Sequence, residues 1–159
     1  VTAKIIQHYS ISQKRGLSAY MLAITKVVFK KVTPRTIKIK IDKKETELKP
    51  HLFFISNSGL IGYNLSLTPE APLDDGQLHL LYTDKMSFIE KLVFIYSMVT
   101  KSVLKSEKIH RTKFESLELF SIPKENFLIQ IDGESVLTKK DTLLISIKKK
   151  ALQVLVPKP

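Results

Sequence analysis

Cysteine is absent from the sequence, which excludes disulfides and zinc sites with thiolate ligands. This absence fits a reducing compartment, so we expect a cytoplasmic location. Only five glycines and seven prolines occur, which excludes collagen-like and low-complexity chains. No uncharged apolar run is long enough for a membrane-spanning helix. What remains is a chain of 159 residues, 43% of them hydrophobic, and we expect residues 1–159 to form a single domain with a buried core.

Common catalytic and nucleotide-binding motifs are also missing. The sequence contains no Gly-Lys-Ser/Thr phosphate loop, no Gly-x-Gly-x-x-Gly and no Gly-x-Ser-x-Gly. The histidines lack the His-Glu-x-x-His spacing of a metal site and lie far apart: His8, His51, His79 and His110. A self-contained enzyme is therefore not predicted. Because the sequence begins at Val1, with no Met and no apolar leader, we expect a piece of a longer protein.

Positive charge is abundant. Lysine and arginine number 26 against 15 acidic residues, giving a net charge of +11, which attracts nucleic acids and anionic lipids. Only Arg15, Arg35 and Arg111 are arginines, and specific base recognition favours arginine. The lysine-rich strand also lacks interleaved aromatic residues for stacking on bases. An anionic membrane surface is therefore favoured over nucleic acid as the polyanionic partner.

Hydrophobic periodicity divides the first half of the chain into a helix and strands. Apolar residues at helical spacing predict an amphipathic helix near residues 16–31. Ile37, Ile39 and Ile41 alternate with lysines, as in a half-buried strand. The uninterrupted run Leu52–Ile55 predicts a central buried strand. Residues 57–76 are dense in turn formers.

In the second half of the chain the spacing of apolar residues again distinguishes a helix from strands. A strand is expected over residues 78–82, followed by a helix near residues 86–104 that begins at Asp84 or Ser87. We expect the following residues to form the core-facing side of that helix: Phe88, Leu92, Ile95, Val99 and Val103. Beyond it, alternating apolar residues predict strands around a hairpin turn at Asp132-Gly133, with the last strand through Leu152, Val154 and Val156. The fold class is α+β and mostly β: an antiparallel, sandwich-like lobe with two amphipathic helices.

Three polar features each allow two interpretations. Four lysines could attract an anion or simply solvate the edge of a sheet: Lys38, Lys40, Lys43 and Lys44. The segment Asp74-Asp75-Gly76 could bind a hard cation with its carboxylates and carbonyls, or be a plain turn. Asp132-Gly133-Glu134 could carry a catalytic carboxylate or only a hairpin turn.

The order of these segments adds a further indication. Asn57-Ser58-Gly59 follows a predicted strand, the run Pro69-Glu70-Ala71-Pro72-Leu73-Asp74-Asp75-Gly76 comes next, and Ile131-Asp132-Gly133-Glu134 lies near the end. This order resembles the C-terminal half of the diacylglycerol kinase catalytic family, which includes sphingosine, ceramide and bacterial lipid kinases. In that family Asn-Gly precedes a glycine-rich stretch, then Pro-x-Ala-x-x-Asp-Asp-Gly, and later Asp-Gly-Glu. The resemblance extends from about Lys14 to the end of the chain.

The resemblance implies a role for each matching residue. Glu134 corresponds to the general base that takes the proton from the lipid hydroxyl, with Asp132 and Gly133 shaping its turn and Asn57 supporting the substrate side. Asp75 corresponds to the side-chain ligand of a structural Mg²⁺. The backbone carbonyls of Pro72 and Gln77 correspond to its other protein ligands.

Two departures from the family pattern qualify this expectation. The run of glycines is replaced by the bulkier Gly59-Leu60-Ile61-Gly62-Tyr63-Asn64. The family's Gly-Gly-Asp-Gly-Thr motif, which holds ATP in an N-terminal lobe, does not occur in this sequence. The expected function is therefore the C-terminal domain of a cytoplasmic, membrane-peripheral lipid kinase that uses ATP and Mg²⁺, inactive as an isolated chain. The alternative is a noncatalytic regulatory module of the same fold that binds anionic lipid or nucleic acid.

Overall fold

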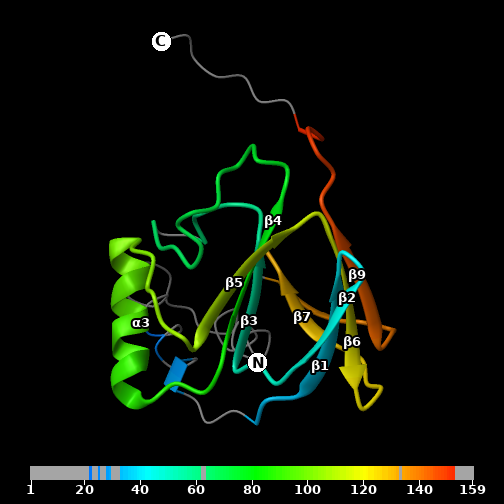
Figure 1. Ribbon diagram of the computed structural model, residues 1–159, viewed down its shortest axis with the longest axis horizontal. Helices are drawn as coiled ribbons and strands as arrows, with labels where there is room; N and C mark the ends of the chain where they lie inside the picture. Colours follow the sequence, from blue (N-terminus) through cyan, green and yellow to red (C-terminus); the bar gives the residue numbers. More distant parts are fainter. Residues whose placement is uncertain are drawn as a thin grey trace.

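Antiparallel strands dominate the part of the chain that the structure describes (Figure 1). The structure is a computed structural model, and it describes residues 22, 25, 28, 29, 33–61, 64–132 and 134–152. One sheet has the strand order β2-β1-β6-β9, a second has β3-β4-β5, and β7 and β8 form a hairpin. The strands are β1 (Thr36–Ile41), β2 (Lys44–Leu48), β3 (Leu52–Ser56), β4 (Leu78–Thr83), β5 (Ile109–Phe114), β6 (Ser116–Ile122), β7 (Leu128–Ile131), β8 (Glu134–Leu137) and β9 (Thr142–Ser146).

The main core lies between the two larger sheets. Alternation places one face of each strand inward, and the buried side chains come from β1, β4, β5 and β6. They are Ile37, Ile39, Leu78, Leu80, Phe114, Leu117 and Leu119. This packing of two antiparallel sheets confirms the predicted fold class, α+β with a mostly β, sandwich-like arrangement.

The chain passes from one sheet to the other at Glu115. β5 ends at Phe114 in the three-stranded sheet, and β6 begins at Ser116 in the four-stranded sheet. The strands over residues 109–122 were not predicted from the sequence. The alternation that indicates one of them is visible in β6, where Leu117 and Leu119 are buried on either side of the partly exposed Glu118.

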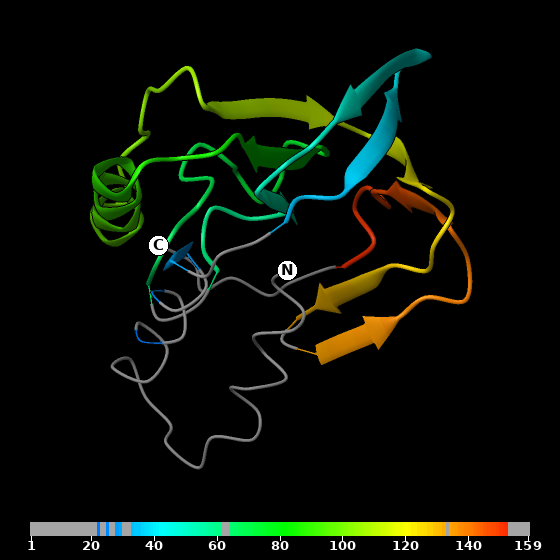
Figure 2. The ribbon, with the colours of Figure 1, turned by 90° about the horizontal axis from the view of Figure 1, so that it is seen from below.

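The helix α3 (Phe88–Thr100) covers the other side of the three-stranded sheet (Figure 2). It begins at Ser87, whose hydroxyl accepts a hydrogen bond from the Glu90 N–H, while the Glu90 carboxylate accepts one from the Ser87 N–H at 2.7 Å. The hydrogen bond from Lys108, together with those from Ser87, lowers the pKa of Glu90 to about 2. Lys101, with φ 54°, ends the helix in a left-handed conformation. The predicted helix is confirmed, with Ser87 as its cap.

The predicted core-facing side of this helix is wrong. Phe88, Leu92 and Val99 are 66%, 48% and 50% exposed. The buried positions are instead Phe94, Ser97 and Met98, on the opposite side. The error has a physical cause: apolar residues occur all around α3, so periodicity alone did not determine which side faces the sheet.

Other predictions differ in position or cannot be compared. β3 is a strand, but it lies at an edge of its sheet and β4 is central. Its apolar run arises because Phe53 and Ile55 contact the core between the sheets, while Leu52 and Phe54 contact the core beneath α3. Residues 22, 25, 28 and 29 are helical, and the rest of the predicted helix 16–31 lies outside the described residues, as do Val154 and Val156. Leu152 is described and lies outside any strand.

The lysines of β1 pair with acidic residues of neighbouring strands. Lys38 Nζ lies 2.8 Å from Glu45 of β2, and Lys40 Nζ lies 3.5 Å from Glu118 of β6. The carboxylate beside it raises the pKa of Lys38, and the lysine lowers that of Glu45. This arrangement favours the interpretation of a solvated sheet surface over an anion-binding face.

Candidate functional site

A buried polar network fixes the loop that follows β3. Ser66 and Thr68 are 2% and 0% exposed although both carry hydroxyl groups. The Thr68 hydroxyl shares a hydrogen bond of 2.7 Å with Ser56 and donates to the Ser58 carbonyl at 3.2 Å. The Ser66 hydroxyl donates to the Gly59 carbonyl. These bonds attach the second half of the loop to the end of β3, so its backbone is held in place.

Asn57 is exposed and directly follows β3. The last residue of that strand, Ser56, pairs with His79 of β4. Asn57 and Gln77 therefore lie at the same end of the three-stranded sheet, because the two strands are antiparallel. The structure thus brings Asn57 and the Asp-Asp-Gly turn to one sheet end.

Asp75 accepts several hydrogen bonds at this end. Its Oδ1 accepts from the Gln77 N–H at 3.0 Å, and its Oδ2 lies 2.9 Å from His79 Nε2. Lys113 Nζ lies 3.4 Å from the same Oδ2. The hydrogen bond from His79, followed by that from Gln77, lowers the pKa of Asp75 below its ordinary value. The following Gly76 has φ +67°, a conformation that favours glycine, so this position of the turn requires glycine.

This arrangement offers a magnesium ion few protein ligands. A carboxylate offers about four acceptor positions, and three donors already approach Asp75. Pro72 is exposed and Gln77 half-buried, both within three residues of Asp75. Among the described residues, no group of three or more His, Asp or Glu side chains is placed to hold a metal. A cation here would have Asp75 as its one side-chain ligand, with carbonyls and water as the others.

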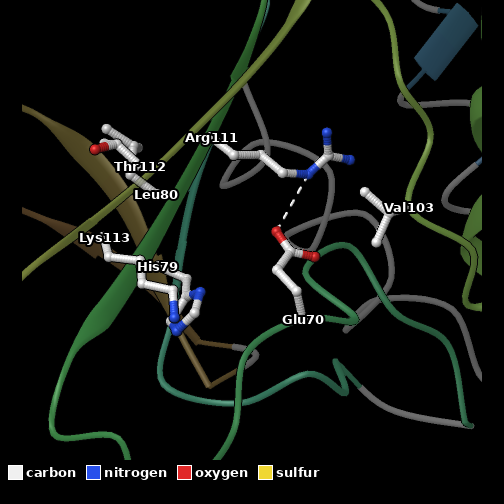
Figure 3. A pocket seen from close by; sticks show the side chains of 7 residues that line it. All are labelled: Glu70, His79, Leu80, Val103, Arg111, Thr112 and Lys113. Carbon is white, nitrogen blue, oxygen red and sulfur yellow. Dashed lines mark ion pairs between the residues drawn. The ribbon is translucent and has the colours of Figure 1, made fainter.

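A cavity of about 300 Å³ adjoins the Asp75 turn (Figure 3). Its lining residues come from the loop before the turn, from β4 and β5, and from the segment after α3. They are Glu70, His79, Leu80, Val103, Arg111, Thr112 and Lys113. His79 and Lys113 are cross-strand partners and also contact Asp75, so they connect the turn to the cavity.

An ion pair crosses this cavity. Arg111 Nε lies 3.3 Å from Glu70 Oε1, and Arg111 also donates to the Leu104 carbonyl at 3.1 Å. The second oxygen of Glu70 is buried and has no hydrogen-bond partner among the described residues. The cavity therefore presents both signs of charge, with an unused acceptor on Glu70.

His79, Arg111 and Lys113 were not predicted from the sequence to belong to a site. The i, i+4 spacing of Asp75 and His79 was one available signal. Arg111 and Lys113 alternate on the β5 face that is opposite the core between the sheets. Their proximity to Glu70 and Asp75 depends on the pairing of β4 with β5, which periodicity does not specify.

Glu134 lies on a different element from Asp75. It begins β8 and pairs with Ile131, so β7 and β8 form a hairpin at the predicted position, and Asp132 lies in its connection. Asp132 has φ 48°, and both Asp132 and Glu134 are exposed. Gly133 itself lies outside the described residues. The structure therefore groups Asn57, the Asp75 turn and the cavity around one sheet end, and it places Glu134 on a separate hairpin.

Comparison with known proteins gives a match over nearly the whole chain. The family described as YegS C-terminal NAD kinase beta sandwich-like domain matches residues 2–156. No curated protein matches by sequence. One similar solved structure, from Bacillus anthracis str. Sterne and assigned as a diacylglycerol kinase, has a TM-score of 0.61 and 21% identity over 84% of this chain. A second diacylglycerol kinase structure from that strain has a TM-score of 0.58 and 19% identity over 79% of this chain.

The two structures extend beyond the region that they share with this chain. The chain covers 46% of the first and 43% of the second, so it spans less than half of either. At these identities the likeness shows a common fold. The arrangement of two sheets and α3 described above is that common fold.

Proposed function

Because the chain belongs to the family of YegS C-terminal NAD kinase beta sandwich-like domains, we propose that it is the C-terminal part of a lipid kinase. The kinase would transfer the γ-phosphate of ATP to a hydroxyl of diacylglycerol or a related lipid. The family match over residues 2–156 carries this proposal. The Asp74-Asp75-Gly76 and Asp132-Gly133-Glu134 segments support it, because the first precedes β4 and the second lies where β7 joins β8, in the order that the resemblance to lipid kinases implies.

Glu134 is the proposed general base. Its carboxylate accepts the proton of the lipid hydroxyl, and the hydroxyl oxygen forms a bond to the γ-phosphorus. The bond between that phosphorus and the β–γ bridging oxygen breaks, and ADP leaves. The exposure of Glu134 at the tip of a hairpin leaves its carboxylate accessible to a substrate. Asp132 and Gly133 shape the turn, and Asn57 supports the substrate side from the end of β3.

Asp75 is the proposed side-chain ligand of Mg²⁺, with the carbonyls of Pro72 and Gln77. Bound Mg²⁺ would offset the charge of these oxygens and draw the turn together. The lowered pKa keeps Asp75 ionised, as a ligand must be. His79 and Lys113 position its carboxylate from β4 and β5.

This proposed function also needs a nucleotide-binding lobe, which would belong to a longer protein. We propose that a nucleotide-binding lobe holds most of the ATP and that the present domain forms the acceptor side of the cleft; we call this assembly the two-lobe protein. The net charge of +11 favours association with an anionic membrane from the cytoplasmic side, where the lipid substrate lies. Among the described residues, no helix combines the length and apolar character needed to cross a bilayer.

The test is turnover of the two-lobe protein with ATP, Mg²⁺ and diacylglycerol, sphingosine or ceramide in detergent micelles. We expect phosphorylated lipid from the two-lobe protein and none from the isolated chain, because half a cleft does not bring ATP to the acceptor. NAD, which the family description names, serves as an alternative acceptor. Transfer to NAD but not to lipid would contradict the lipid assignment, and absence of any transfer would favour the noncatalytic module.

A further inference from the structure

The side of α3 that faces away from the sheets is apolar. It comprises Phe88, Ile89, Leu92, Val93, Tyr96 and Val99, which we call the outer face. Ile89 and Tyr96 are the most exposed, at 72% and 68%. At about 100° per residue the six side chains occupy one arc of roughly 140°. Thr100 is the only polar helix residue within that arc. Exposed apolar surface of this kind marks an interaction site.

The charged residues of α3 are on its other sides. Glu90 is directed to the cap and to Lys108, whose Nζ lies 2.8 Å away. Lys91 lies beside Phe29, with its Nζ 5.7 Å from the centre of that ring. The buried side contains Phe94 and Met98. The helix is therefore apolar on two sides, one packed on the sheet and the other facing solvent.

Exposed lysines lie at both ends of the outer face. Residues 84–108 contain five lysines and three acids, and Lys85, Lys101 and Lys105 flank the two ends of α3 as exposed residues. Residues 1–32 contain six basic residues and no acid. Phe29, near the end of that stretch, contacts Phe88 with ring centroids 4.9 Å apart. Phe29 thus lies beside the first turn of α3.

We propose that the outer face of α3 docks on an anionic lipid bilayer. Apolar side chains would enter the boundary between headgroups and acyl chains, and the flanking lysines would contact the headgroup phosphates. Tyr96 suits this boundary because its ring is apolar and its hydroxyl polar. α3 lies at one side of the molecule in Figure 1, and Figure 2 shows it nearly end-on at the same side. The proposal rests on the proposed lipid kinase function and names the surface that meets the lipid.

The charge pattern distinguishes this occupant from a protein partner. The centre of a protein interface is depleted in lysine, but a basic rim around an apolar helix face is typical of helices that lie on anionic membranes. A second copy of the chain would bring the same lysines opposite one another, and like charges would repel.

The experiment is vesicle sedimentation of the chain as it exists, with phosphatidylcholine vesicles and with equal parts phosphatidylcholine and phosphatidylglycerol. The double variant Ile89→Asp/Tyr96→Asp should lower partitioning to the anionic vesicles by about tenfold or more. Leu144→Asp is the matched control, because Leu144 is 70% exposed but lies on β9, and it should bind as the unchanged chain does. Lys85→Gln/Lys105→Gln should weaken binding to anionic vesicles by about fivefold per lysine and leave phosphatidylcholine binding unchanged.

Three outcomes would overturn the proposal. The first is that the double aspartate variant binds vesicles as well as the Leu144→Asp control does. The second is that light scattering shows a dimer, which the aspartates dissociate without affecting vesicle binding. The third is that the two-lobe protein does not bind vesicles that the isolated chain binds. Micelle activity separates this proposal from the proposed function. Turnover in micelles without vesicle binding refutes the docking face alone, and face-dependent vesicle binding without turnover refutes the kinase alone.

Discussion

Asp75 and Glu134 are both carboxylates beside tight turns, but their surroundings differ. Asp75 is engaged by a backbone N–H, a histidine and a lysine, and it lies against a cavity between a loop and a sheet. Glu134 is exposed at the start of a four-residue strand in a two-stranded hairpin. Similar motifs can therefore have different surroundings: three donors hold the Asp75 carboxylate, whereas Glu134 is exposed.

The largest effect should come from Glu134→Gln in the two-lobe protein. Removing a general base lowers kcat by about 10²–10⁴-fold, whereas an exposed hairpin residue changes the free energy of unfolding by at most about 0.5 kcal/mol. Steady-state kinetics and urea unfolding measure the two quantities. Asp132→Asn should reduce kcat less, because asparagine tolerates the turn conformation.

The matched control is Glu47→Gln, which removes another exposed strand carboxylate away from the hairpin. It should leave kcat unchanged. Turnover of Glu134→Gln near that of the control would remove the general base from this hairpin and leave Asp132-Gly133-Glu134 as a turn only.

Leu81→Ala tests how strongly packing stabilises β4, the strand that carries His79, the partner of Asp75. Leu81 is fully buried beneath α3, two residues along β4 from His79, so its truncation leaves a cavity between α3 and the three-stranded sheet. A loss of about 2–5 kcal/mol in the free energy of unfolding is expected. Denaturant titration measures it, with Leu144→Ala, at a site 70% exposed, as a control that should cost little. Equal losses in both variants would mean that Leu81 does not support this region.

His79→Phe should have a smaller effect than Leu81→Ala. Phenylalanine fills the buried site but donates no hydrogen bond to Asp75, whose Oδ2 then keeps only the longer contact to Lys113. The urea midpoint should fall, and the pKa of Asp75 should rise toward its ordinary value of 3.8. Carboxyl NMR titration gives this pKa directly. An unchanged value would show that His79 does not control the Asp75 carboxylate.

The smallest effect should be on the stability of the fold at low pH. The pKa of Asp75 is lower in the folded chain than its ordinary value of 3.8, so its contribution to stability is present above that value. The contribution is lost as the pH falls below 3.8 through the folded pKa. Urea unfolding at a series of pH values should therefore show a steeper acid loss in the unchanged chain than in Asp75→Asn. Parallel curves would contradict the assigned hydrogen bonds.

The sequence predicted what periodicity and turn chemistry determine. The β1 strand, the hairpin of β7 and β8, and a helix cap at Asp84 or Ser87 follow from local patterns. The structure contains all three, with Ser87 as the cap. The orientation of α3 did not follow, because its apolar residues surround the helix and only the sheet beneath it selects a side. The cavity did not follow either, since Glu70 and Arg111 meet only once two distant segments are paired. Roles for Glu134 and the magnesium ligands stay predictions.

The crossing at Glu115 makes the two sheets depend on each other for folding. β5 and β6 are separated by that single residue, whose carbonyl accepts the Ile147 N–H at 3.0 Å just beyond β9. With only one residue between them, neither strand can leave its sheet without displacing the other. The two sheets should therefore open as one cooperative unit. Native-state hydrogen exchange would then report a common opening free energy for β5 and β6. The β7–β8 hairpin, outside this unit, would exchange its amide protons sooner.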